Sequence, residues 1–173
     1  MPTNLKYRSK PVYWDEKRQK IATKEQIESA FLLNPTAKKR EFSRFDSTLE
    51  FNVYLRLVEM FGSKRITRQF PVQIVPPGYC YKSGKNWRID FAIFDDNDQK
   101  FPTYLVEAKG AVMPDFRHCV ASLEVYDPGS FDRLSIVFGR SVPPDKMMKN
   151  LMSTDFSQRI YTLKELQCTN TLR

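Results

Sequence analysis

Residues 105–110 read Leu-Val-Glu-Ala-Lys-Gly, a segment in which apolar residues alternate with charged ones. The pattern predicts a strand over 103–109 that ends before Gly110. Because successive side chains of a strand point to opposite faces, Glu107 and Lys109 share one face. A carboxylate and an ammonium group are therefore expected side by side.

A second strand is predicted over 87–94, and the polar turn 95–98 joins it to the first. Antiparallel pairing across that turn is expected to bring Asp90 beside Glu107. Strict alternation divides the strand into two faces: Trp87, Ile89, Phe91 and Ile93 on one, and Arg88, Asp90, Ala92 and Phe94 on the other.

The strongest helical pattern lies before these strands, with Asp46 or Ser47 as its N-cap and Gly62 at its end. Its apolar stripe consists of Val53, Tyr54, Leu57, Val58 and Phe61. Counting back along the stripe leads to Glu50. An unpaired carboxylate on a buried face is costly, so a cation is expected to face it, either a metal ion or an arginine such as Arg56 or Arg88.

The remaining pattern completes a mixed sheet. A strand over 66–74 contains Pro71, which predicts an edge position or a bulge. A second helix follows Gly110, and an apolar strand over 134–138 is expected to run parallel to the strand over 103–109. The order αβββαβ places the chain in the α/β class, bordering on α+β. We expect a basic N-terminal arm with a short helix (1–42), a core (43–142) and a C-terminal helical or strand extension (143–173).

Charge is distributed unevenly. The chain has 173 residues, 28 of them basic and 20 acidic, and its net charge is +8. Residues 1–44 hold 11 of the basic and 5 of the acidic side chains, so most of the excess lies in this first quarter. This layout indicates either an arm that follows nucleic-acid phosphates or a basic surface kept for solubility.

Two compositional facts limit the chemistry. A single histidine and three widely spaced cysteines leave no set of imidazole or thiolate ligands for zinc. Any metal here must be held by oxygen.

The longest apolar runs are far shorter than a bilayer requires, and no signal-peptide pattern follows Met1, so no membrane partner and a cytoplasmic location are expected.

Carboxylates from Glu50, Asp90 and Glu107 would suit magnesium or manganese. The chemistry that such a site favours is phosphodiester hydrolysis, with Lys109 near the attacking water. The alternative is that Glu107 and Lys109 form only a cross-strand charge pattern.

These residues resemble the PD-(D/E)XK nuclease superfamily: Glu50 on a helix, Asp90 on a strand, and Glu107-Ala108-Lys109 on the next strand. The segment Phe45–Glu50 and the later Arg68-Gln69-Phe70-Pro71 are most similar to junction-resolving and TnsA-type transposition endonucleases of phages and mobile elements. Ile89 stands where the family motif has proline. The resemblance covers about residues 43–142 and implies a restriction-endonuclease-like fold.

The resemblance also implies a function, metal-dependent cleavage of DNA at a junction or an element end. Asp90 and Glu107 would bind Mg or Mn, with the Ala108 carbonyl as a further ligand, and Glu50 would hold a second metal or an outer-sphere water. Lys109 would lie near the nucleophilic water. Implied partners are DNA, other recombination or transposition subunits, and a second copy of the chain, because double-strand cleavage needs two sites.

Basic and polar side chains outside this motif are candidates for DNA contact. They are Lys38, Lys39, Arg40, Arg44, Gln69, Lys82, Lys85 and Arg88. The last three, together with Tyr79, Tyr81 and Trp87, are expected to form a basic aromatic loop that touches DNA or stacks on an unpaired base; an ordinary hairpin loop is the alternative. For the whole chain, the alternative is a catalytically silent DNA-binding or assembly subunit on the same fold.

Overall fold

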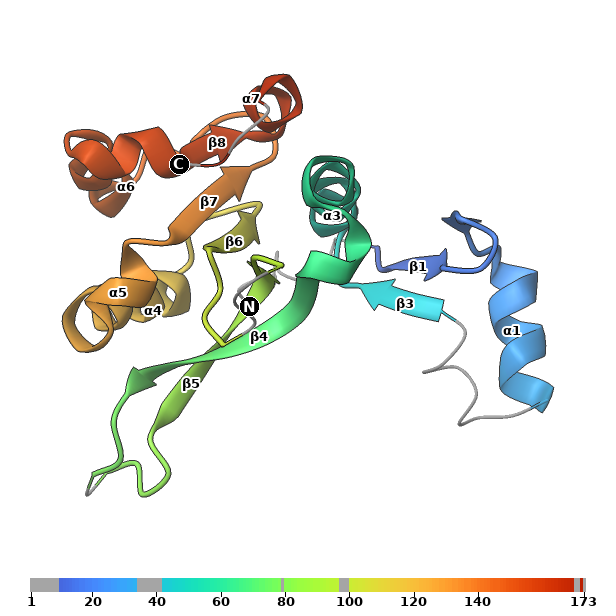
Figure 1. Cartoon of the computed structure of the whole chain (residues 1–173), viewed down its shortest axis with the longest axis horizontal. Coiled ribbons are helices and arrows are strands. Elements are labelled where there is room, and N and C mark those ends of the chain that lie inside the picture. The colour runs from blue at the N-terminus through green and yellow to red at the C-terminus, as the bar shows by residue number, and fades with distance from the viewer. Residues whose placement is uncertain (1–9, 34–41, 79, 97–99, 170–171, 173) are drawn as a thin grey trace, which may run out of the picture. The chain divides into compact units, whose positions relative to one another are not determined.

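The computed structural model describes residues 10–33, 42–78, 80–96, 100–169 and 172. The chain divides into two compact units, residues 1–51 and 52–173. The fold belongs to the α/β class, as predicted, with a five-stranded mixed sheet flanked by helices (Figure 1).

The first unit contains a small antiparallel sheet with the strand order β2-β1-β3. Its elements are β1 (Val12–Asp15), β2 (Lys20–Ile21), α1 (Lys24–Leu33), β3 (Phe42–Phe45) and the first residues of α3 (Thr48–Phe61). Phe51 of α3 contacts Trp14 and Phe45, with ring centroids 5.1 and 5.2 Å apart. The described part of the expected basic arm is thus a folded unit with an aromatic core.

The short helix expected in this region is present as α1. Its N-terminus is capped by two reciprocal hydrogen bonds: the Thr23 hydroxyl accepts from the Gln26 backbone N–H at 3.3 Å, and the Gln26 side chain accepts from the Thr23 N–H at 2.9 Å. The spacing of Thr and Gln in the sequence therefore indicates correctly where this helix begins.

The second unit is built on a five-stranded sheet with the order β4-β5-β6-β7-β8. The strands are β4 (Ile66–Val75), β5 (Lys85–Ile93), β6 (Tyr104–Lys109), β7 (Leu134–Phe138) and β8 (Ile160–Thr162). The first three strands are antiparallel neighbours, and β6, β7 and β8 are parallel. The predicted parallel pairing of 134–138 with the strand before it is confirmed, as is the edge position of the strand that contains Pro71.

Helices cover both faces of this sheet (Figure 1). On one face, Tyr54 of α3 stacks on Phe91 of β5 at 6.1 Å, and Phe61 lies 5.8 Å from Tyr104. On the other face lies α4 (Pro114–Tyr126), followed by α5 (Pro128–Phe131). The remaining elements are η2 (Ser63–Arg65), α6 (Lys146–Met152), η3 (Asp155–Arg159) and α7 (Leu163–Cys168).

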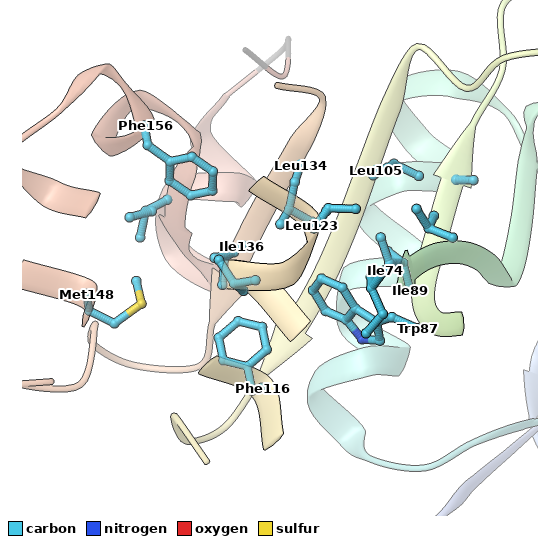
Figure 2. Packing of buried hydrophobic residues seen from close by; sticks show 14 of the residues in the cluster. Ile74, Trp87, Ile89, Leu105, Phe116, Leu123, Leu134, Ile136, Met148 and Phe156 are labelled. Carbon is cyan, nitrogen blue, oxygen red and sulfur yellow. The ribbon is translucent and has the colours of Figure 1, made fainter. Parts of the chain in front are cut away.

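The main hydrophobic cluster fills the space between the sheet and α4. Figure 2 shows Phe116 and Leu123 of α4 among side chains from β4, β5, β6 and β7. Trp87 meets Phe116 edge to face, with centroids 5.9 Å apart. Met148 and Phe156 extend the same cluster toward the C-terminal elements, so the segment after 142 shares the core of the sheet.

Strict alternation along β5, expected from the sequence, is wrong at Asp90. Trp87, Ile89 and Ala92 belong to the cluster beneath α4, whereas Phe91 stacks on Tyr54 of α3. The strand therefore changes its buried face between Ile89 and Phe91. The neighbouring strand does the same, because Arg68 lies over the Tyr54 ring at 5.8 Å while Phe70 packs on the α4 side.

The matched change of face has a local backbone cause. Gln69 lies between Arg68 and Phe70 and has a φ of 53°, in the left-handed region that only glycine adopts freely. Cross-strand pairing continues on both sides of it, with Arg68 opposite Phe91 and Phe70 opposite Ile89. The two strands thus turn together at the level of Gln69 and Asp90.

Among the helices described, none has the length and apolarity needed to cross a membrane.

Candidate metal centre

Two carboxylates meet where β5 and β6 pair. Phe91 is opposite Val106 in the antiparallel register, which brings Asp90 beside Glu107 as predicted. The Asp90 N–H donates to Glu107 Oε2 at 3.0 Å, and the Ala108 N–H donates to Asp90 Oδ2 at 2.9 Å. Each carboxylate is therefore held by a backbone N–H of the strand that carries the other.

Lys109 completes the group on β6. Its Nζ forms an ion pair with Glu107 Oε1 and lies over the ring of Phe116, 5.4 Å from the centroid. The predicted sharing of one face by Glu107 and Lys109 is confirmed. The contribution of Phe116 was not predicted, although the short link from Gly110 to the helix start at Pro114 confines the first helical turn to the end of β6.

Gln69 joins the carboxylates from the edge strand. Its Nε2 donates to Asp90 Oδ1 at 3.2 Å, so Asp90 receives one hydrogen bond from each neighbouring strand. A left-handed backbone at a non-glycine residue costs on the order of 1–3 kcal/mol and is found where the surroundings determine the conformation. Here it accompanies a side chain that fixes a carboxylate.

Burial and like charge dominate the electrostatics. Glu107 is 1% exposed, and its burial together with the negative charge of Asp90 raises its pKa to about 8. The Lys109 ammonium opposes this shift but does not cancel it. For Lys109, burial alone would lower the pKa, and the charges of Glu107 and Asp90 outweigh burial, so its pKa is raised. A cation beside the two carboxylates would favour their charged forms.

Cys119 and Lys85 lie on the same side of the sheet as this group. Burial raises the pKa of the Cys119 thiol, and the charges of Lys85, Glu107, Lys109 and Asp115 also act on it. Cys119 packs against the main cluster. Lys85 is exposed at the start of β5.

Glu50 belongs to the first unit, where it has a structural function. It is 5% exposed, its Oε2 accepts the Asp46 N–H at 2.8 Å, and its own N–H donates to the Ser47 hydroxyl at 3.0 Å. Ser47 is thus the N-cap of α3, one of the two residues predicted for that position. The proposed metal ligation by Glu50 remains a prediction.

Two arginines were considered as partners of Glu50, and side-chain interactions are shown for Arg56. Arg56 pairs with Glu59 at 2.9 Å and donates to the Leu166 and Thr169 carbonyls at 3.2 and 2.5 Å. Arg88 is exposed on β5, opposite Pro71 of β4. The interactions shown for Arg56 therefore hold the C-terminal segment.

The donor set suits a hard divalent cation. Magnesium binds in many enzymes through one or two carboxylates and retains water ligands. Asp90 and Glu107 supply two such groups, and the resemblance implies the backbone carbonyl of Ala108 as a further ligand. The raised pKa of Glu107 reflects its burial first and the negative charge of Asp90 second. Within the described residues, no group of three or more His, Cys, Asp or Glu side chains is arranged to hold a metal ion. The suitability of this site for a divalent cation therefore depends on the Asp90 and Glu107 carboxylates.

The candidate DNA contacts fall into three groups. Lys38, Lys39 and Arg40 lie outside the described residues. Arg44 is exposed on β3 and pairs with Asp46 at 3.2 Å. Gln69, Lys82, Lys85 and Arg88 are exposed in the β4–β5 hairpin.

The predicted aromatic character of this hairpin needs correction at Trp87. Its side chain is 8% exposed and packs on Phe116, so it is not available to stack on a base. Tyr79 lies outside the described residues, whereas Tyr81 is 49% exposed. Trp87 is buried because it occupies the strand face that α4 covers, and a large apolar side chain there gains more from the core than from solvent.

Comparison of the chain with protein-family models, with curated proteins and with solved structures finds no match.

Proposed function

We propose that this protein is a metal-dependent DNA endonuclease that hydrolyses phosphodiester bonds, acting on a DNA junction or an element end of phage or mobile-element type. The observation that carries the proposal is the Asp90–Glu107 pair with Lys109 attached to it, on adjacent strands of one sheet. Two carboxylates beside an amine are the groups that oxygen-based metal catalysis of phosphoryl transfer requires.

In this proposal Asp90 and Glu107 hold magnesium or manganese, with the Ala108 carbonyl as a further ligand. The bound metal supplies a polarised phosphate and a more acidic water. Gln69 keeps the Asp90 carboxylate oriented through its hydrogen bond to Oδ1. The Lys109 ammonium, held by Glu107 and the Phe116 ring, is placed to orient a nucleophilic water or to offset negative charge on the phosphate.

The decisive experiment compares cleavage of supercoiled, branched and single-stranded DNA by the full chain with magnesium, with manganese and with chelator. We expect divalent-dependent cleavage that Asp90→Ala and Lys109→Ala each reduce by at least about 100-fold. Glu124→Gln, an exposed position on α4, is the control and should cleave normally. Equal behaviour of the wild type and Asp90→Ala on every substrate would refute nuclease activity.

A metal-binding measurement separates ligation from turnover. Calorimetric titration with manganese should give a saturable site in the wild type that is weakened in both Asp90→Ala and Glu107→Gln. Retention of full manganese affinity by both variants would show that the carboxylate pair is not the metal site.

The second candidate function is a catalytically silent DNA-binding or assembly subunit, which the concentration of positive charge in residues 1–44 favours. DNA binding should then persist with chelator and be unchanged in Asp90→Ala, without cleavage of any substrate. Association should weaken steeply as salt is raised, since phosphate contacts release counterions.

A further inference from the structure

The β4–β5 hairpin is the most uniformly charged part of the chain. Residues 60–89 contain no aspartate or glutamate and include six basic side chains: Lys64, Arg65, Arg68, Lys82, Lys85 and Arg88. Some of these are occupied within the fold, because Arg65 bonds the Phe94 carbonyl at 2.7 Å and Arg68 lies over Tyr54. Lys82, Lys85 and Arg88 are exposed toward the hairpin end.

This hairpin extends beyond the sheet as a two-stranded ribbon. β5 pairs with β6 only through Phe91, Ala92 and Ile93, whereas it pairs with β4 from Ile93 back to Lys85. Figure 1 shows the ribbon reaching away from β6 and β7. Its outer part is two strands wide, with α4 packed on one face as far as Ile74 and Trp87 and a turn at its end.

The two faces of the ribbon differ. Val72, Ile74 and Trp87 point to the cluster beneath α4. Pro71, Gln73, Asn86 and Arg88 are all exposed. The exposed face thus has a cation and amides but no acidic group.

The turn is built tightly. The Gly78 and Gly84 N–H groups both donate to the Tyr81 carbonyl at 2.9 Å. Gly84 has a φ of 72°, and a Cβ there would lie 2.6 Å from the Val75 carbonyl oxygen, so only glycine fits. This backbone presents the half-exposed Tyr81 ring and the Lys82 ammonium at the end of the ribbon.

We propose that the ribbon end enters the major groove of duplex DNA, with Lys82, Lys85 and Arg88 on the flanking phosphates. The exposed positive charge of the ribbon favours a polyanionic partner. The major groove of B-DNA, roughly 12 Å wide, admits a two-stranded ribbon, whereas the major groove of an RNA duplex is too narrow. Single-stranded nucleic acid is held by rows of exposed aromatic rings, and here Trp87 and Phe70 face the core.

The inference rests on the proposed function for its biological setting, but its test does not need cleavage. Fluorescence anisotropy of the full chain in chelator measures binding to a 30-base-pair DNA duplex, the equivalent RNA duplex and the single DNA strand. We expect the DNA duplex to bind most tightly. The variant Lys82→Ala/Lys85→Ala/Arg88→Ala should bind it at least about tenfold more weakly. Its salt slope, the steepness with which the logarithm of the binding constant falls with the logarithm of salt concentration, should be lower by about 0.9 for each phosphate that is no longer neutralised.

The matched control is Lys146→Ala/Lys149→Ala/Lys164→Ala, which removes the same charge from exposed positions of α6 and α7. It should lose less affinity and retain the salt slope. Thermal denaturation of both variants confirms that the fold is kept. An equal loss of affinity in the two variants, or tighter binding to RNA or to single strands than to duplex DNA, would overturn the inference.

Placement in the groove has its own measurement. Guanine N7 lies in the major groove, so wild-type protein should protect it from dimethyl sulfate, and the hairpin variant should not. Binding without N7 protection would contradict groove entry. No divalent ion is present in these assays, so they test DNA binding by the hairpin without cleavage. A failure of the carboxylate site is distinguished from a failure of the hairpin as loss of cleavage while duplex binding is retained.

Discussion

At the scale of single residues, Gln69 shows how a strained backbone and a polar contact are combined. It is in the left-handed region at the point where β4 and β5 change their buried faces, and its amide holds Asp90. Glycine adopts the left-handed backbone conformation about as readily as the right-handed one, whereas a residue with a Cβ does so at a cost of roughly 1 kcal/mol or more.

This gives a prediction about stability. Gln69→Gly should be more stable than Gln69→Ala by about 1 kcal/mol, because both lose the amide but only glycine relieves the strain. At Thr67, an exposed residue of the same strand, the order should reverse, since glycine weakens an extended strand. Urea unfolding of the four variants measures both differences. An alanine variant as stable as the glycine variant at position 69 would show that the left-handed conformation is not strained.

Glu107 gives a prediction about pH. Its pKa of about 8 in the folded protein exceeds the ordinary value of 4.5, so the folded state retains a proton that the unfolded chain has released. The stabilisation is complete below about pH 4.5 and is lost as pH rises through about 8. The free energy of unfolding in chelator should therefore fall across this range.

Glu107→Gln should remove that fall, because glutamine does not titrate, whereas the exposed-position variant Glu124→Gln should keep it. Denaturant unfolding at a series of pH values makes the comparison. The pKa of Lys109 is raised from 10.5, so its contribution changes only at higher pH. A fall of the same size in Glu107→Gln and the wild type would place the responsible group elsewhere.

The approach of Asp90 to Glu107 could be predicted from sequence because polar residues 95–98 separate two consecutive apolar strands, which favours antiparallel pairing. The change of face at Gln69 and Asp90 could not. Neither residue is a glycine or proline, and alternation is the default for an extended chain. The left-handed backbone at Gln69 accompanies a hydrogen bond to Asp90 on the next strand, a contact that the sequence of either strand alone does not contain.

At the scale of elements, α3 depends on its first turn. Ser47 caps the helix, and Glu50 bonds the backbone before it, so two polar side chains satisfy groups at the N-terminus. The stripe of apolar residues correctly indicated the burial of Glu50. The role of Glu50 at the start of the helix could also be predicted, because Ser47 and Glu50 have the Ser-x-x-Glu spacing of a capping box.

Ser47→Ala should lower the free energy of unfolding by about 1 kcal/mol, since the Glu50 N–H loses its acceptor. Thr48→Ala, an exposed neighbour within the same turn, is the control and should have a smaller effect. Chemical denaturation measures both. A Ser47 variant indistinguishable from the control would mean that water replaces the hydroxyl without loss.

At the scale of the whole molecule, the chain is two compact units, and each has a net charge of +4. The first unit is less than half as long as the second, so its positive charge is denser. The order of elements in the second unit followed from the sequence because each strand was bounded by turn residues. The small sheet of the first unit was less evident, since β1 and β2 are short and their pairing partner β3 lies more than twenty residues away. Such non-local pairing leaves little periodic signal.

If the first unit binds the phosphate backbone of DNA, neutralising its exposed lysines should weaken DNA binding. The variant Lys10→Gln/Lys17→Gln/Lys20→Gln should bind duplex DNA less tightly, and its salt slope should fall by about 0.9 for each lysine that neutralises a phosphate in the wild type. The triple alanine variant of Lys146, Lys149 and Lys164 is again the control. An unchanged slope would indicate that the charge of this unit serves solubility.

The edge strand β4 also restricts how copies of the chain can associate. Pro71 has no N–H to donate, and the backbone at Gln69 departs from extended geometry, so the outer border of the sheet lacks a regular row of hydrogen-bonding groups over this stretch. Continuation of the sheet from one molecule into the next is therefore disfavoured at this border. A homodimer of this protein is therefore not expected to form by pairing of two β4 strands.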